Sequence, residues 1–240
     1  MTCELSEQTL SHINARYLLI YTKKSASLSE KLDLRSSVKK QSILAVLFLF
    51  VGGCSMHSEL PDYVPTKDVV LHKAAQRFAF PLKKEDTKDI RTLEAKYDAE
   101  ENCAGLAGPQ IGIGKAVIIF EVKDDPDLKK IRKDLVQTMS KTIFLNPSYE
   151  AIGTEMTEDW EGCLPVSDVA GIVKRYNEIR YIAFDETGKK ITGIATGFLA
   201  RIIQHETDHI NGILFAEKAI KTMSLVEYRA MRQAALKDKK

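Results

Sequence analysis

Two histidines and a glutamate stand at a spacing that suits metal-assisted hydrolysis. His205, Glu206 and His209 are spaced so that a helix would carry them on one stripe facing the protein interior. The imidazoles would then lie one turn apart and could bind one metal ion, while the glutamate between them could act on a water molecule without being a ligand. This is the HExxH arrangement, for which the alternative interpretation is a pair of core histidines beside a surface glutamate.

A catalytic metal needs a third protein ligand, and its position decides the class of enzyme. In one group of zinc proteases the motif extends as HExxHxxGxxH; this chain has the glycine, Gly212, but Phe215 stands where the last histidine is required. Another protease group takes a downstream glutamate, and Glu217 and Glu227 are available without a diagnostic spacing. The better candidate is Cys163, for which the alternative is a small buried hydrophobic side chain.

Three segments together resemble the motifs of the peptide deformylase family. They read GLAGPQIG (105–112), EGCLP (161–165) and QHETDHINGILF (204–215). The family motifs read approximately GxGLAxxQ, EGCLS and QHExDH and occur in the same order. The resemblance runs from about residue 68 to 220, and the agreement of three motifs is far more specific than HExxH alone.

The resemblance implies a metal site with a defined set of ligands. Cys163, His205 and His209 would hold one divalent ion and leave its fourth tetrahedral position for water. The family commonly uses Fe(II), sometimes replaced by zinc, nickel or cobalt, and a thiolate with two imidazoles is compatible with these metals. We therefore expect one divalent metal ion, with Fe(II) the first choice.

The same resemblance implies a reaction and the residues that perform it. Glu206 would accept a proton from the attacking water and pass a proton to the departing amine. The Gln110 side-chain amide and the Leu164 backbone N–H would stabilise the oxyanion, and Gly105 would let the substrate backbone approach closely. The expected reaction removes the formyl group from the N-formylmethionine of peptides or nascent proteins and releases formate. Two alternatives stay open: a metallopeptidase that uses the same site, and a non-catalytic deformylase-like lipoprotein.

The substrate side of the site departs from the family pattern. Cys103 replaces the leading glycine of the first motif, Gly108 replaces alanine, and Pro165 replaces serine. Pro165 removes a backbone donor and restricts φ. These changes put the peptide preference and the rate in doubt, and in an oxidising compartment Cys103 could pair with Cys163 if the two come within disulfide range.

Two carboxylates near the ligands have more than one interpretation. Glu161 could orient a ligand through hydrogen bonds, and Asp208 could hold the second nitrogen of a histidine. Either could equally be a capping or surface carboxylate.

The elements that must position these residues follow from periodicity and turn signals. The sequence predicts helices over residues 68–78, 84–101 and 196–209, strands over 115–122, 142–149, 178–185 and 190–195, and a last helix from Ser224. Residues 104–114 form a Gly-rich segment, and Asn211 and Gly212 are a plausible helix C-cap. The order predicts an α+β fold in which mostly antiparallel sheets wrap around a central helix carrying the HExxH motif.

Composition narrows the possible partners. The chain has 240 residues, with 35 Lys plus Arg against 33 Asp plus Glu, so it has no overall field that would recruit nucleic acid. Its four cysteines are too few and too scattered for a disulfide framework, and none forms a CxxC pair. We expect a monomer that binds formylated peptides and no nucleic acid.

The N-terminal region resembles a bacterial lipoprotein signal. Two lysines precede a short apolar run, residues 43–51, which is followed by two glycines and Cys54. Cleavage before Cys54 would make it a lipidated residue anchored to a membrane; otherwise the protein is cytoplasmic, with 43–51 an ordinary buried element. We therefore expect an N-terminal extension with this signal (1–54), a polar tether (55–67), a metallohydrolase domain (68–220), and a C-terminal helix and basic tail (221–240).

Overall fold

The fold combines two antiparallel sheets with several helices. The computed structural model describes residues 60–100, 103–163 and 166–237. In chain order the elements are the 3₁₀ helix η2 (Val69–His72), α1 (Lys84–Asp98), β1 (Gly105–Ala107), the 3₁₀ helix η3 (Gly108–Ile111), β2 (Val117–Val122), α2 (Pro126–Ile131), β3 (Met139–Ala151), β4 (Met156–Cys163), β5 (Val166–Tyr176), β6 (Glu178–Phe184), β7 (Lys190–Thr196), α3 (Gly197–Ile210), α4 (Phe215–Lys218), β8 (Ala219–Ser224) and α5 (Leu225–Lys237). The N-terminal signal and Cys54 lie outside the described residues.

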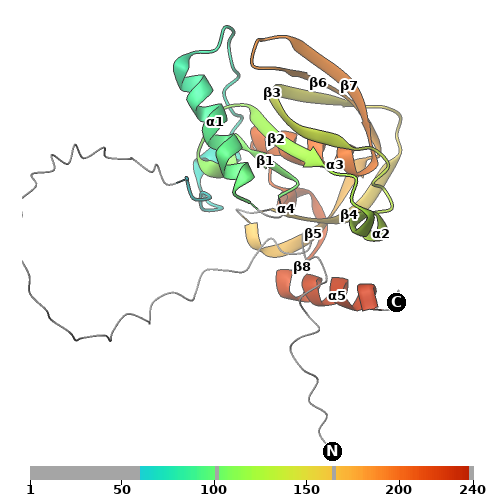
Figure 1. The fold of residues 1–240 in the computed structure, drawn as a ribbon. Coiled ribbons are helices and arrows are strands. Elements are labelled where there is room, and N and C mark those ends of the chain that lie inside the picture. The colour runs from blue at the N-terminus through green and yellow to red at the C-terminus, as the bar shows by residue number, and fades with distance from the viewer. Residues whose placement is uncertain (1–59, 101–102, 164–165, 238–240) are drawn as a thin grey trace, which may run out of the picture. The chain divides into compact units, whose positions relative to one another are not determined.

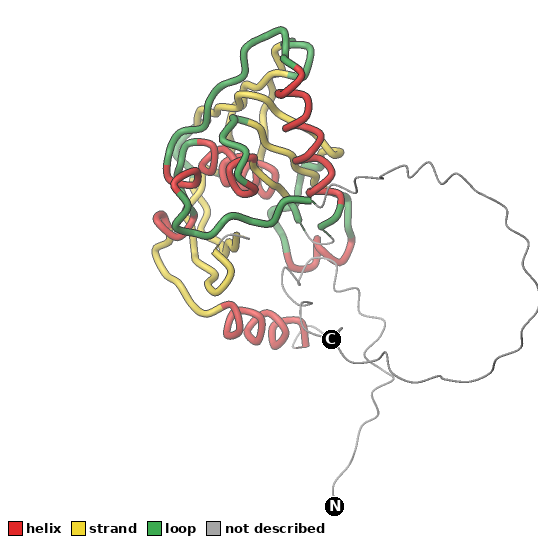
Figure 2. The backbone as a smooth tube through the Cα atoms, turned by 90° about the vertical axis from the view of Figure 1, so that its left-hand side faces the viewer, coloured by secondary structure: helices red, strands yellow, loops and turns green. Residues whose placement is uncertain are grey.

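The two sheets surround α3. Among the described residues, one sheet has the strand order β1-β2-β3-β6-β7 and the other has β4-β5-β8, with every neighbouring pair antiparallel. Helix α3 contacts strands of both sheets, and Figures 1 and 2 show it among them. The predicted fold class, antiparallel sheets around a central helix with the HExxH motif, is confirmed.

Strand β2 separates two parts of the core. Successive side chains of a strand point to opposite faces, so Phe120 packs in the cluster that contains Leu199 of α3, whereas Ile119 packs in the cluster that contains Leu93 of α1. All four side chains are almost completely buried. Because β2 is covered on both faces, its first four residues, VIIF, form a continuous apolar run rather than an alternating one.

The ends of α3 are set by backbone conformation. The helix begins after Thr196 at Gly197, whose φ of +56° is disfavoured for other residues. It ends at Ile210, with Asn211 as the C-cap and Gly212 at φ +77° after it, as the sequence predicts. A side chain at Gly212 would come within 2.6 Å of the Lys73 backbone nitrogen, so glycine also permits close packing at the end of the helix.

The predicted helix over residues 68–78 is wrong after its first turn. Only η2 is helical there, and the chain then runs extended. The backbone groups are used in contacts with distant segments: Ala75 N donates to Ile210 O at 2.7 Å, and Ala116 N donates to Gln76 O at 2.9 Å. These tertiary hydrogen bonds satisfy backbone groups that a helix would have paired locally.

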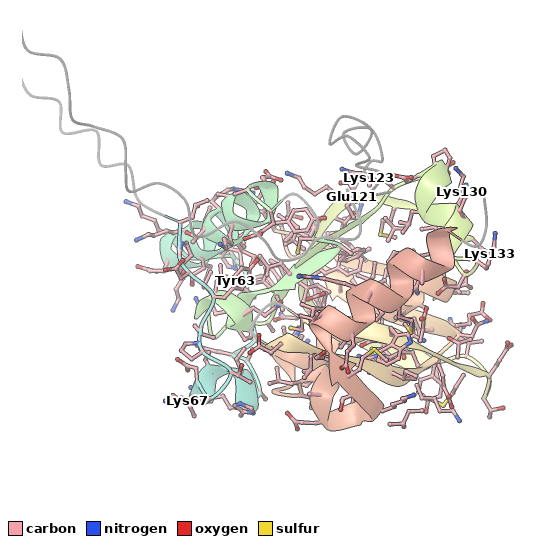
Figure 3. The ribbon with its side chains drawn as sticks, turned by 90° about the horizontal axis from the view of Figure 1, so that it is seen from below. Tyr63, Lys67, Glu121, Lys123, Lys130 and Lys133 are labelled. Carbon is pink, nitrogen blue, oxygen red and sulfur yellow. The ribbon has the colours of Figure 1, made fainter. Side chains whose placement is uncertain are left out.

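Part of the predicted tether (55–67) belongs to the packed domain. Val64 N donates to Gln110 O at 3.0 Å. The ring of Tyr63 packs against the α1 side of the core, and the Lys96 ammonium lies 4.5 Å from its centroid. Figure 3 shows Tyr63 beside this helix. The folded domain therefore begins before residue 68.

Other predicted elements are confirmed, with one shifted boundary. β2, β3, the β6–β7 hairpin, α1 and α3 all lie where the sequence places them. The predicted last helix is α5, and Ser224 and Glu227 cap each other at its start. The boundary between residues 220 and 221 falls inside β8, which pairs with β5, so residues 221–224 belong to the sheet. No helix within the described residues has the length and apolar character needed to cross a membrane.

Candidate active site

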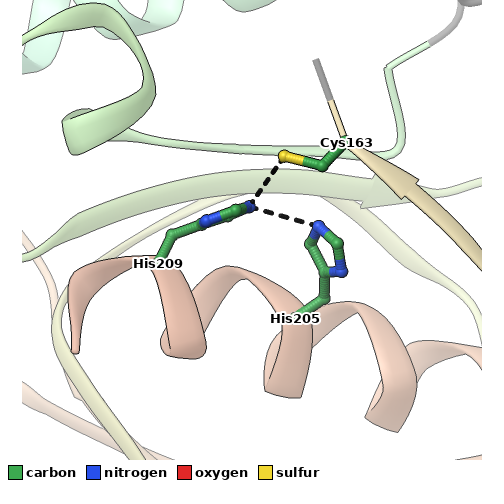
Figure 4. Close-up of side chains that lie close together, drawn as sticks. All are labelled: Cys163, His205 and His209. Carbon is green, nitrogen blue, oxygen red and sulfur yellow. Dashed lines mark hydrogen bonds between the residues drawn. The ribbon is translucent and has the colours of Figure 1, made fainter. Parts of the chain in front are cut away.

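Two histidines of α3 converge on one point. The Nε2 atoms of His205 and His209 lie 3.2 Å apart (Figure 4). His209 is 1% exposed and His205 is partly buried. Because α3 is buried on most of its surface, both imidazoles are held inside the protein rather than in solvent.

Cys163 approaches the two imidazoles from the three-stranded sheet. It is the last residue of β4, which pairs with β5 along most of its length. Its Sγ atom lies 3.2 Å from His209 Nε2 (Figure 4). The donor atoms of Cys163, His205 and His209 all lie within 4.8 Å of one another. The structure thus brings together the three residues predicted as ligands.

The spacing of these atoms fits a small transition-metal ion. Two nitrogens that each lie about 2.0–2.1 Å from a tetrahedral ion are separated by about 3.3 Å. The Nε2 atoms of His205 and His209 are 3.2 Å apart, close to that separation. One sulfur and two imidazoles suit iron, zinc, nickel or cobalt, whereas calcium and magnesium prefer oxygen ligands.

Glu161 orients the first histidine. Its Oε2 atom lies 2.9 Å from His205 Nδ1, so Nδ1–H donates and Nε2 keeps its lone pair for a metal. Arg175 donates two hydrogen bonds to the carboxylate, at 2.9 and 2.8 Å, and Arg201 donates a third at 2.7 Å. Burial opposes ionisation, but hydrogen bonds from Arg175 and His205 outweigh it and hold the pKa of Glu161 well below its ordinary value.

Asp208 extends this ionic network away from the histidines. Its carboxylate contacts Arg175 and accepts hydrogen bonds from Lys218 Nζ at 3.1 and 3.0 Å. Asp208 therefore forms an ion pair with Arg175 and does not hold the second nitrogen of a histidine. Of the roles that the sequence leaves open for Asp208, that of a histidine partner is not the one observed. His209 Nδ1 is buried and finds no hydrogen-bond partner among the described residues.

Glu206 is buried beside the ligands with a free acceptor. It is 4% exposed, and its Oε2 atom has no hydrogen-bond partner among the described residues. On the other side it meets Gly105, where a Cβ atom would lie 2.5 Å from Glu206 Oε1. Burial, assisted by the negative charge of Glu161, raises the pKa of Glu206 to about 7. A carboxyl group with this pKa can both accept and release a proton near neutral pH.

Gln110 directs its amide nitrogen toward the ligands. It lies in η3 and is 3% exposed. Its Oε1 accepts a hydrogen bond from Ala107 N at 2.6 Å, and its Nε2 donates to Cys163 Sγ at 3.5 Å. The second predicted oxyanion donor, the backbone N–H of Leu164, lies outside the described residues, as does Pro165.

Cys103 is bound to the backbone of the first motif. Within the described parts of the chain, neither Cys103 nor Cys163 forms a disulfide. The Cys103 thiol donates a hydrogen bond to Gly105 O at 2.7 Å. Burial, and then the negative charge of Glu206, raise the pKa of Cys103 well above its ordinary value. The thiol is therefore protonated at neutral pH and available as a donor.

The two buried arginines of the ionic network, Arg175 and Arg201, are not predicted from the sequence. Arg201 lies one turn before His205, and a cation within an otherwise apolar helical segment was a usable signal. Arg175 gave no local signal, because its carboxylate partners, Glu161 and Asp208, come from β4 and α3.

Comparison with known sequences identifies relatives of this chain. The family model for polypeptide deformylase matches residues 62–224. Peptide deformylase 2 of Rickettsia conorii is 49% identical over 187 residues, which cover 74% of this chain and 93% of that protein. Peptide deformylase 1 of Nitrosomonas europaea is 43% identical over 114 residues, covering 48% and 62% of the two chains.

Solved structures give the same result. The Met-Ala-Ser-bound class I type b peptide deformylase from Acinetobacter baumannii is 27% identical, with a TM-score of 0.59, and the match covers 66% of this chain and 98% of that one. Peptide deformylase from Thermotoga maritima, 23% identical with a TM-score of 0.56 over 68% and 99% of the two chains, shares the fold. This chain belongs to the polypeptide deformylase family and is a metal-dependent hydrolase that removes the N-formyl group from nascent peptides.

Proposed function

We propose that Cys163, His205 and His209 hold one Fe(II) ion, which zinc, nickel or cobalt can replace. The convergence of a thiol and two imidazoles in a buried position supports this ligand set. When bound, the ion would supply Lewis-acid chemistry, polarising water and the formyl oxygen. Glu161 would keep His205 in the orientation and tautomer that ligation requires.

Glu206 is the proposed proton carrier. Its free Oε2 atom would accept a proton from the attacking water, and the same carboxyl group would deliver a proton to the departing amine nitrogen. Its burial beside Gly105 excludes bulk water from the carboxylate. Burial raises the pKa of Glu206 above its ordinary value, which strengthens the carboxylate as a base.

Gln110 and Leu164 are the proposed oxyanion donors. Gln110 Oε1 is already fixed by Ala107 N, so the side-chain amide cannot rotate freely and its Nε2 group faces the ligands. A donor held in place before the charge develops stabilises it without reorganisation. The Leu164 backbone N–H follows the metal ligand Cys163 directly in the chain, which supports its assignment as the second donor.

The proposed substrate is a peptide that begins with N-formylmethionine. The structural neighbour from Acinetobacter baumannii binds Met-Ala-Ser, the sequence of a deformylated product. A side chain at Gly105 would collide with Glu206; the glycine thus leaves the carboxylate in place, and the absence of a Cβ atom would let the substrate backbone approach closely.

A substrate panel tests this proposal. The full chain, loaded anaerobically with Fe(II), should release formate from formyl-Met-Ala-Ser and leave acetyl-Met-Ala-Ser and free Met-Ala-Ser intact. Cleavage of the peptide bonds would instead indicate a metallopeptidase. Absence of any hydrolysis despite full metal occupancy would favour a non-catalytic role. A Cys163→Ser variant should lose most of its metal, as measured by mass spectrometry.

We also propose that the protein is a monomer whose location depends on its N-terminal signal. If Cys54 is acylated, a lipid there anchors the domain to a membrane; if the signal is not used, the enzyme is cytoplasmic. Metabolic labelling with radioactive palmitate, beside a Cys54→Ala control, distinguishes the two locations. Light scattering of the purified domain in detergent-free buffer tests the oligomeric state.

A further inference from the structure

One edge of the five-stranded sheet is open beside the active site. Among the described residues, β1 pairs with β2 on one side only. In an antiparallel ladder, the backbone N–H and C=O of every second residue bond to the neighbouring strand. The backbone groups of the residues between them point to the opposite side. Ala104 is a residue whose carbonyl bonds to β2, since it accepts a hydrogen bond from Glu121 N. Gly105 follows Ala104 and lies opposite Phe120. The carbonyl of Gly105 therefore points away from β2, toward the open edge.

Two outward-facing backbone groups of this edge are hydrogen-bonded to side chains. The Cys103 thiol donates to Gly105 O at 2.7 Å. Two residues further on, Ala107 N donates to Gln110 Oε1 at 2.6 Å. Backbone groups on an open edge are the ones that an extended peptide uses when it adds to a sheet. In this chain one such acceptor is already taken by a thiol.

The occupied carbonyl belongs to a residue that touches the proposed proton carrier. A Cβ atom on Gly105 would lie 2.5 Å from Glu206 Oε1 and 2.8 Å from its Cδ. Glu206 is almost completely buried, and its other oxygen has no partner among the described residues. An extended peptide that adds to the open edge of β1 to bring its formamide to Glu206 would offer its own N–H to the outward-facing Gly105 carbonyl.

We propose that Cys103 sets the affinity for substrate: its thiol occupies the Gly105 carbonyl and must be displaced by the formamide N–H of the substrate. The inference rests on the proposed role of Glu206. Residue Cys103 is partly exposed, and a change of its χ1 rotamer would move the thiol away from the carbonyl when the substrate binds. Displacing this hydrogen bond costs binding free energy before any bond is broken, so it raises KM and leaves kcat nearly unchanged.

The strength of the donor at position 103 provides the test. Cys103→Ala removes the donor, and Cys103→Ser replaces a weak S–H donor by a stronger O–H donor. With formyl-Met-Ala-Ser, KM should rise in the order Ala, Cys, Ser, with steps of about 2- to 10-fold, the range expected for one hydrogen bond. The kcat values should agree within about twofold, because the displaced bond is already broken when the substrate is bound.

A matched control removes a similar bond elsewhere in the sheet. Thr142 Oγ1 donates to Ser140 O at 2.7 Å on β3, two strands from β1. Thr142→Val should leave both KM and kcat unchanged. If Ala and Ser at position 103 change KM in the same direction, or leave it unchanged, packing rather than the donor acts there and the proposal is wrong.

A spectroscopic readout reports the displacement directly. The frequency of the infrared S–H stretch of Cys103 depends on whether the thiol donates a hydrogen bond. The band is isolated by subtracting the spectrum of the Glu206→Gln, Cys103→Ala double variant from that of the Glu206→Gln variant. Saturation with unhydrolysed formyl-Met-Ala-Ser should move this band to the frequency of a free thiol. An unchanged band in the saturated complex would overturn the proposal. Failure of the proposed function is a separate result, since it would abolish formate release in the unaltered protein.

Discussion

Glu161 Oε2 lies 2.9 Å from His205 Nδ1, and this bond determines which nitrogen of the imidazole is left for a metal. The carboxylate that makes the bond is itself fixed by Arg175 and Arg201. The position of a metal ligand on α3 therefore depends on charged side chains from β4, β5 and α3 together.

Removing the charge of Glu161 should weaken metal binding. Glu161→Gln keeps the shape of the side chain but loses the carboxylate that polarises His205, and loss of such a partner typically lowers metal affinity by about 10- to 100-fold. Competition with a chromophoric chelator measures the change. Glu158→Gln, on the same strand but exposed, is the control and should bind metal normally. Equal affinities in both variants would show that Glu161 does not orient the ligand.

Arg175 should contribute strongly to the stability of the fold. It is 1% exposed and contacts both Glu161 and Asp208. Arg175→Met would leave two buried carboxylates without their shared cation, and breaking a buried pair in this way costs about 3–5 kcal/mol. Urea denaturation gives the free energy of unfolding. The neighbouring exposed Lys174→Met should cost less than about 1 kcal/mol, and similar losses in both variants would contradict the account.

Residues of the site that are close together in the sequence could be predicted from their spacing, whereas residues brought together by tertiary packing could not. His205, Glu206 and His209 are close in sequence, and helical spacing alone places them on one stripe. Cys163 required a motif resemblance, because its approach to the histidines depends on how β4 packs against α3. The extended segment around Ala75 could not be predicted, since its hydrogen bonds go to distant parts of the chain.

The strands β4 and β5 were missed for a related reason. Strand signals depend on alternation of apolar and polar residues, and these strands carry Glu161 and Arg175 at buried positions. The network pairs these charges with each other, so the interior can hold them, but neither residue looks like a core residue in isolation. The buried ion pairs that position the site therefore remove the apolar pattern by which β4 and β5 could be predicted as strands.

A side chain at Gly105 should impair catalysis by displacing the proton carrier. In Gly105→Ala the new Cβ would lie 2.5 Å from Glu206 Oε1, so the carboxylate must move. A displacement of about 1 Å in a catalytic group can lower the rate by about 100-fold. Measurement of kcat with formyl-Met-Ala-Ser tests this, with metal content measured in parallel. Unchanged kcat at full occupancy would contradict the placement of Glu206 at the reacting atoms.

The pH dependence of kcat/KM should reflect Glu206. The base must be unprotonated to accept a proton, so activity falls as the pH drops through its pKa. Burial raises the pKa of Glu206 to about 7 in the metal-free protein, and a nearby divalent ion lowers it. The acid limb should therefore lie at or below pH 7. Activity that stays constant or increases toward lower pH, while metal is retained, would contradict this role.

The central claim is that Glu206 transfers protons during metal-dependent deformylation, and formate release tests it most directly. The full chain and its Glu206→Gln variant would be loaded anaerobically with Fe(II), and metal content and formate release from formyl-Met-Ala-Ser measured in both. We predict release by the unaltered protein and a loss of about 10²- to 10⁴-fold in the variant at equal metal content. No release by the fully loaded unaltered protein, or undiminished release by the variant, would contradict the claim.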